Sequence, residues 1–115
     1  MKTLDQLRLT EREKNAIKEA TKLLKEKFLV SEVILFGSKA RGDDDPESDI
    51  DLLLLTPEPL SWRERENIIN TLFDVELTYD VVISIMDTTV SEWENGVFTV
   101  LPIHKNISRD GVVTA

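Results

Sequence analysis

Two aspartates one residue apart, Asp49 and Asp51, stand at the start of the most apolar run in the chain, and a Gly-Ser pair at 37 and 38 precedes them. Charged carboxylates at the start of a buried strand cost folding free energy unless a cation neutralises them. The chain has no Cys and a single His, so hard oxygen ligands for Mg²⁺ or Mn²⁺ are favoured over a Zn²⁺ site. The pattern predicts a metal site within residues 37–55.

The Gly-Ser pair, Gly37 and Ser38, predicts a phosphate site beside that metal. A short helical segment from Ser38 to Arg41 offers backbone N–H groups and a hydroxyl to a phosphate, although Ser38 could also serve only as a helix cap. Lys39 and Arg41 add positive charge, and of the two Arg41 is the better candidate for contacting phosphate or a partner. A phosphate cradle beside an acidic metal site is the equipment for metal-assisted phosphoryl or nucleotidyl transfer.

Three predicted strands position these residues, at 32–36, 50–55 and 79–86. The second strand is apolar on both faces, as expected of a central strand that is covered on each side. A helix that starts after Ser61 and ends near Asp74 separates the second strand from the third. This β-α-β unit predicts two parallel strands joined by a right-handed crossover.

The strand directions predict that the candidate residues meet at one edge of the sheet. Parallel strands begin at the same edge, so Asp49 and Asp51 should lie near Asp80, which opens the predicted third strand. If the first strand is antiparallel to the second, its end brings Gly37 and Ser38 to this edge too. For Asp80, the alternative is a strand-end cap or an ordinary ion pair.

The remaining elements complete an α/β (α+β) fold, a small mixed sheet with a β-α-β crossover and flanking helices. Thr10 and Glu13 have the spacing of a capping box, and apolar residues recur at helical intervals after them. The other predicted helical segments are a first helix over 11–28, a preceding turn at Leu4 and Leu7, a turn at Ser91–Glu94 and a last helix from Pro102 to before Gly111.

Composition limits the class of protein. With 115 residues, one domain over 1–115 is expected. Fourteen Lys and Arg against 22 Asp and Glu give a charge of −8, which disfavours nucleic acid as a direct substrate but suits a divalent cation or a basic protein partner. The absence of Cys, of a signal sequence and of an apolar stretch long enough to span a bilayer predicts a cytoplasmic protein without a membrane partner.

Gly37-Ser38, ten intervening residues and then Asp49-Ile50-Asp51 resemble the signature of the DNA polymerase beta-like nucleotidyltransferase superfamily. The longer strings G-S-K-A-R-G at 37–42 and S-D-I-D-L at 48–52 are similar to the minimal nucleotidyltransferases, which often act as antitoxins of HEPN-type toxins. The resemblance implies the polymerase beta-like nucleotidyltransferase fold. The acidic loop at 43–47 departs from the family pattern.

The resemblance also implies a role for each candidate residue. The Gly-Ser pair would hold the triphosphate of ATP, and Asp49 and Asp51 would ligate two Mg²⁺ ions, or Mn²⁺. Asp80 would be the third carboxylate, which binds one ion and helps to deprotonate the attacking hydroxyl. Arg41 would contact phosphate or the partner. Three other acids are close to Asp80 in sequence: Asp74, Glu76 and Asp87.

The function that the resemblance implies is Mg²⁺-dependent transfer of AMP from ATP to a hydroxyl of a HEPN-type toxin, with tyrosine as the expected acceptor. The chain would then be an antitoxin that works within a hetero-oligomer. Two alternatives stay open. In one, the chain neutralises its partner by binding alone, and in the other it transfers a nucleotide to a small-molecule hydroxyl.

Overall fold

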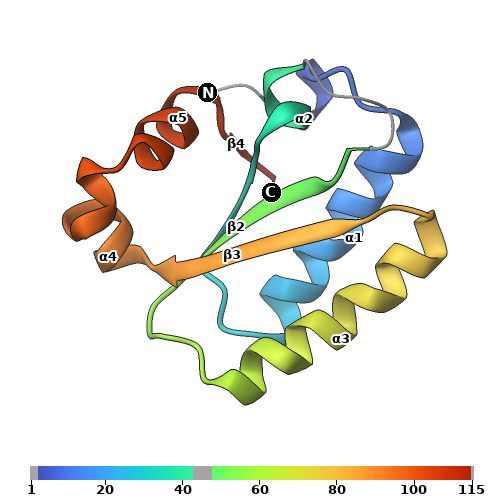
Figure 1. The fold of residues 1–115 in the computed structure, drawn as a ribbon. Helices are drawn as coiled ribbons and strands as arrows, with labels where there is room; N and C mark the ends of the chain where they lie inside the picture. The colour runs from blue at the N-terminus through green and yellow to red at the C-terminus, as the bar shows by residue number, and fades with distance from the viewer. Residues whose placement is uncertain (1–2, 43–47, 115) are drawn as a thin grey trace.

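The structure is a computed structural model that describes residues 3–42 and 48–114. Its centre is a four-stranded mixed sheet in the order β3-β2-β1-β4 (Figure 1). The strands are β1 (Glu32–Phe36), β2 (Ile50–Thr56), β3 (Ile83–Thr89) and β4 (Val112–Val113). The predicted α/β class and mixed sheet are confirmed.

The predicted parallel pair of strands is confirmed, and the first strand meets the condition set for it in the sequence analysis. β1 is antiparallel to β2, and β2 is parallel to β3. Phe36 at the end of β1 lies opposite Asp51 near the start of β2, and Asp51 in turn lies beside Ser84 of β3. The end of β1 and the starts of β2 and β3 therefore share one edge of the sheet, which we call the site edge.

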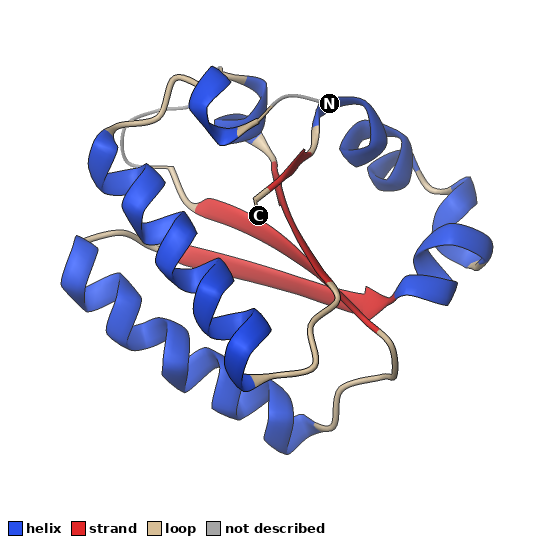
Figure 2. Cartoon of the chain, turned by 180° about the vertical axis from the view of Figure 1, so that it is seen from behind, coloured by secondary structure: helices blue, strands red, loops and turns tan. Residues whose placement is uncertain are grey.

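One face of the sheet is covered by two helices, α1 (Glu11–Lys27) and α3 (Trp62–Tyr79), which pack side by side (Figure 2). α1 begins where the sequence predicts, because the Thr10 hydroxyl accepts from the N–H of Glu13 and the Glu13 carboxylate accepts from the N–H of Thr10. Its apolar stripe packs on the inward residues of β2. The buried side chains of this layer include Ala16, Ile17, Ala20, Leu24, Ile50, Leu52, Leu54, Ile68, Leu72 and Val75.

The opposite face is covered by α4 (Val90–Asn95), the 3-10 turn η2 (Val97–Val100) and α5 (Pro102–Asp110). These elements form a second apolar cluster with alternate residues of β2. The cluster includes Leu53 and Leu55 of β2 and Trp93 of α4. On this face, Asp51 is only half-buried and Asp49 is exposed. Side chains alternate between the two faces of β2, and the leucines of both faces are buried farther along the strand. At its start, Asp49 and Asp51 stay accessible at the site edge.

The boundaries around the third strand differ from the predictions. α3 continues to Tyr79 rather than ending near Asp74, and β3 runs from Ile83 to Thr89 rather than from Tyr79 to Met86. The helix continues because Val75 and Tyr79 extend its inward stripe onto the apolar core. Short β4 was not predicted at all; it pairs with the outer side of β1.

The shorter helical elements are η1 (Leu4–Gln6) and α2 (Ser38–Arg41). Among the helices of the described ranges, none combines the length and the apolar character needed to cross a bilayer.

Candidate active site

The site is built on the paired acids of β2. Asp49 directly precedes β2 and Asp51 is its second residue, so both side chains lie on the same face. From the neighbouring strand, Ser84 Oγ donates a hydrogen bond of 2.9 Å to Asp49 Oδ2. The sequence analysis missed Ser84, whose only signal is its register opposite Asp51 on the parallel strand.

The electrostatics of the pair fit a divalent cation. Burial and the neighbouring charge of Asp49 raise the pKa of Asp51, and the charge of Arg41 opposes this shift. The two carboxylates therefore repel each other, and Arg41 offsets that repulsion only in part. Closely placed carboxylate oxygens with excess negative charge are the hard donor set that Mg²⁺ or Mn²⁺ accepts.

Gly37 brings the Gly-Ser pair into contact with these acids. Its φ of +75° is in the left-handed region, and a Cβ at this position would overlap the Asp51 carboxylate. A residue with a side chain would meet both obstacles at once. The next residue, Ser38, makes a weak contact of 3.4 Å through its hydroxyl with the hydroxyl of Ser48, just before Asp49. The predicted meeting of the Gly-Ser pair with Asp49 and Asp51 at one edge is thus observed.

Lys39 does not extend into solvent. Its side chain is only 2% exposed, and its ammonium group forms an ion pair with the Glu13 carboxylate of α1. Burial would raise the pKa of Glu13, but the bonds from Lys39 and Thr10 outweigh burial, and the pKa is lowered. The sequence analysis did not foresee this buried pair, because nothing local connects residues 26 positions apart.

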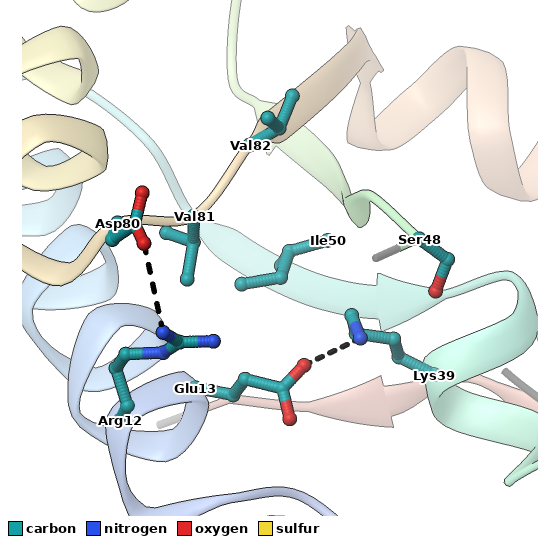
Figure 3. A pocket seen from close by; sticks show the side chains of 8 residues that line it. All are labelled: Arg12, Glu13, Lys39, Ser48, Ile50, Asp80, Val81 and Val82. Carbon is teal, nitrogen blue, oxygen red and sulfur yellow. Dashed lines mark ion pairs between the residues drawn. The ribbon is translucent and has the colours of Figure 1, made fainter. Parts of the chain in front are cut away.

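Asp80 is placed differently from the expectation. It is the C-cap of α3, with φ of +54°, and precedes β3 by three residues, so the prediction that it opens a strand is wrong. Its side chain is 97% exposed and forms an ion pair of 3.8 Å with Arg12 (Figure 3). Within residues 3–42 and 48–114, no three Asp, Glu or His side chains form a group that could hold a metal ion. The structure therefore groups Asp49 with Asp51 but not with Asp80.

Two of the other acids near Asp80 have contacts of their own. Asp87 accepts two hydrogen bonds from the Arg65 guanidinium, at 2.9 and 2.8 Å. The Glu76 carboxylate accepts from the N–H of Ile83 at 3.1 Å and so fixes the start of β3. Neither offers a replacement for a third carboxylate beside Asp49 and Asp51.

A pocket of about 350 Å³ lies at the same edge, on the side of the helix layer (Figure 3). Ser48 and Ile50 line it, whereas Asp49 and Asp51 alternate with them along the chain and face the other side. The other lining residues are Arg12, Glu13, Lys39, Asp80, Val81 and Val82. The acidic loop predicted at 43–47 lies outside the described residues.

Comparison with known families gives one match that covers most of the chain. Residues 17–109 match the family described as nucleotidyltransferase domain. This range contains both the Gly-Ser pair and the two aspartates of β2.

Curated relatives come from Methanocaldococcus jannaschii. The chain is 45% identical over 67 residues to a protein named "Putative protein adenylyltransferase MJ0141". These residues cover 58% of this chain and 66% of that protein. It is 34% identical over 86 residues to "Putative protein adenylyltransferase MJ0128". This alignment covers 72% of this chain and 80% of that protein.

Solved structures share the fold at low sequence identity. A crystal structure of a toxin-antitoxin with AMP-PNP has a TM-score of 0.59 at 19% identity, covering 90% of this chain and 72% of that one. A protein from Sulfolobus solfataricus described as "a putative nucleotidyltransferase" has a TM-score of 0.59 at 21% identity, covering 89% of this chain and 78% of that one. A mutant of the toxin-antitoxin MntA-HpeT has a TM-score of 0.58 at 17% identity, covering 84% and 70%.

Proposed function

The chain belongs to the nucleotidyltransferase domain family, as a minimal nucleotidyltransferase, and on this premise we propose that it transfers AMP from ATP to a hydroxyl of a partner protein. The observation that carries the proposal is the contact between Gly37 and the half-buried carboxylate of Asp51. This contact places a turn suited to phosphate beside a pair of acids suited to a cation.

In this proposal, Asp49 and Asp51 hold Mg²⁺, with Mn²⁺ as the substitute and a second ion where ATP supplies further oxygens. The ion would neutralise charge on the transferred phosphate and on the leaving pyrophosphate. Ser84 keeps the Asp49 carboxylate oriented through its hydrogen bond. The metal role rests on the donor set, because both acids are oxygen donors on one accessible face of β2.

The Gly-Ser pair would bind the triphosphate. α2 is a single turn, so the binding groups are the Ser38 hydroxyl and the N–H groups of the turn rather than a long helix dipole. Gly37 allows the phosphate chain to approach the backbone closely. Arg41 is near enough to Asp51 to influence its pKa, so its charge lies close to where the phosphates would be.

Asp80 remains the predicted third carboxylate, on the strength of its place in the family pattern. Its contact with Arg12 must then be given up when it acts on the acceptor hydroxyl. Asp80→Asn tests this role without disturbing α3, because Asn also tolerates the left-handed conformation. We expect transfer to fall by about 100-fold with ATP binding nearly unchanged, as measured by single-turnover kinetics and calorimetry. Wild-type turnover in this variant would remove Asp80 from the mechanism.

The proposed acceptor is a tyrosine of a HEPN-type toxin, which the modification inactivates. The curated relatives are named as protein adenylyltransferases, and two solved neighbours are toxin-antitoxin proteins. A charge of −8 favours a basic partner over a second copy of this acidic chain. The outer face of α3 also exposes large apolar side chains, which is typical of a protein-binding surface: Trp62, Ile69, Phe73 and Leu77.

The test is mass spectrometry of the purified partner after incubation with the chain, ATP and Mg²⁺. An AMP-sized addition to one tyrosine is expected, and EDTA or the double variant Asp49→Asn/Asp51→Asn should prevent it. Addition to free small-molecule hydroxyls without any partner would contradict the protein acceptor. If the double variant still protects cells from the toxin as well as wild type does, neutralisation works by binding rather than by transfer.

A further inference from the structure

We propose that the buried ion pair between Glu13 and Lys39 positions the phosphate-binding turn, so that Lys39 acts through Ser38 rather than as a phosphate ligand. The inference rests on the proposed function for the meaning of the turn. The pair itself is a feature of the fold, and its effect on the turn can be measured without nucleotide.

The turn needs an anchor because α2 has little structure of its own. It comprises four residues, and the backbone bonds that close it are Arg41 N–H to the Gly37 carbonyl at 3.1 Å and Gly42 N–H to the Ser38 carbonyl at 2.9 Å. A single turn held by so few bonds is not stable in isolation. Its orientation must therefore be set by tertiary contacts.

The ion pair is such a contact. Lys39 and Glu13 are 2% and 9% exposed at their side chains, and the pair joins α2 to the first turn of α1. Glu13 is itself fixed, because its other carboxylate oxygen accepts from the N–H of Thr10 at 3.0 Å. The lysine is thus tied to a rigid helix start rather than to a mobile side chain.

The direction of the two neighbouring side chains explains how the effect reaches the site. Successive residues of a helix point about 100° apart, so Lys39 can face the helix layer while the Ser38 hydroxyl lies 3.4 Å from the hydroxyl of Ser48, just before Asp49. Figure 3 shows Lys39 directed toward Glu13, at the wall of the pocket on the helix side. When the ion pair fixes Lys39 toward the helix layer, it also fixes the neighbouring Ser38 at the site edge.

Four variants test the inference: Glu13→Gln, Lys39→Met, both together, and the control Lys18→Met. Each single substitution removes one charge of the ion pair and leaves the other buried without it, whereas the double variant removes both charges and keeps the fold testable. Lys18 also belongs to an α1 ion pair, but its contact with Asp5 is 4.0 Å long and exposed. Folding is verified by circular dichroism, and all measurements are made well below each variant's melting temperature.

Two measurements follow on each variant. Amide hydrogen exchange over residues 38–42 without nucleotide should accelerate in all three variants of the pair and stay unchanged in the control. Affinity for α,β-methylene-ATP in the presence of Mg²⁺, an analogue whose α–β linkage cannot be cleaved, should fall by about tenfold, and KM for ATP should change more than kcat.

The outcomes separate the alternatives. If Lys39 is a phosphate ligand, Glu13→Gln will bind nucleotide as well as wild type or more tightly, and the inference is overturned. If melting temperatures fall while exchange and affinity stay at wild-type values, the pair only stabilises the fold, and the inference is again overturned. If wild type binds no nucleotide, the proposed function fails, and exchange over residues 38–42 alone decides whether the pair positions the turn.

Discussion

At the scale of single residues, Gly37 has the sharpest requirement in the site. Gly37→Ala should destabilise the protein for two reasons, its φ of +75° and the overlap of a Cβ with the Asp51 carboxylate. Gly42→Ala is the matched control, because Gly42 has a φ of +81° but, among the residues that the structure describes, no atom lies within 4 Å of where its Cβ would be. We expect a loss of about 1 kcal/mol for Gly42→Ala from backbone strain.

For Gly37→Ala we expect a loss at least about 1 kcal/mol larger than for Gly42→Ala, measured by urea unfolding. The difference between the two variants isolates the contact with Asp51. Nucleotide affinity should fall only in the Gly37 variant. Equal losses of stability would mean that the Asp51 carboxylate moves aside without cost.

Ser84 is the second residue whose role can be separated. Ser84→Ala removes the hydrogen bond to Asp49 but leaves both carboxylates in place. A residue that orients a metal ligand typically contributes a factor of about 10 to 100 in metal affinity or activity. We expect Mn²⁺ affinity, measured by electron paramagnetic resonance, to fall by about tenfold. The control Ser91→Ala, on α4, should bind Mn²⁺ like wild type.

At the scale of elements, the Glu13–Lys39 pair predicts a dependence of stability on pH. The pKa of Glu13 is lowered in the fold from its usual 4.5, so its contribution is complete above that value and is lost as pH falls through the lower, folded pKa. At pH 7, Glu13→Gln should lose about 3 kcal/mol of unfolding free energy, because the buried Lys39 ammonium group loses the Glu13 carboxylate.

As pH falls below 4.5 and through the lowered pKa of Glu13, the difference between wild type and Glu13→Gln should shrink, since protonation removes the same charge from the wild-type protein. Urea unfolding of both proteins across this range measures it. A constant difference at every pH would show that the carboxylate charge is not what stabilises the pair.

The accuracy of the predicted helices and strands depends on how strong the local sequence signals are. The first helix and the strand β2 are predicted closely, because a capping box and an unbroken apolar run mark them. The start of β3 is not, because Thr78 to Val82 favours a strand locally while Tyr79 also continues the helical stripe of α3. Packing against the core decides in favour of the helix, and Asp80 becomes its cap.

Within the site, the sequence predicts the residues whose type and spacing mark them at the ends of the strands, and it misses Lys39 and Ser84, whose roles depend on a partner far away in the sequence. Asp49, Asp51 and the Gly-Ser turn meet because antiparallel β1 and β2 share an edge. The burial of Lys39 depends on Glu13, and the position of Ser84 depends on the β2–β3 register. Neither contact is marked by a local sequence pattern.

At the scale of the whole molecule, the exposed face of α3 predicts where a protein partner binds. Phe73 and Leu77 are 55% and 66% exposed on the same side of the helix, away from the core. The double variant Phe73→Ser/Leu77→Ser should weaken binding of the partner by at least about tenfold, because buried apolar anchors dominate interface energies. Calorimetry with the purified partner proposed above measures this binding, and ATP affinity should be unchanged.

Leu29→Ser is the control for that surface. Leu29 is 79% exposed but belongs to the segment between α1 and β1 and not to α3. Its replacement should leave partner binding as it is. If both variants bind the partner like wild type, the contact lies on another part of the molecule.

The short pairing of β4 has a practical consequence for all of these experiments. Thr114 is 6% exposed, and its hydroxyl shares a hydrogen bond of 2.7 Å with Thr21 of α1. Its N–H also donates to the Val33 carbonyl on the strand that leads into the Gly-Ser turn. An affinity tag fused directly behind this residue would disturb these bonds on the strand that leads into the Gly-Ser turn, so a flexible spacer should separate this strand from any purification handle or fluorophore.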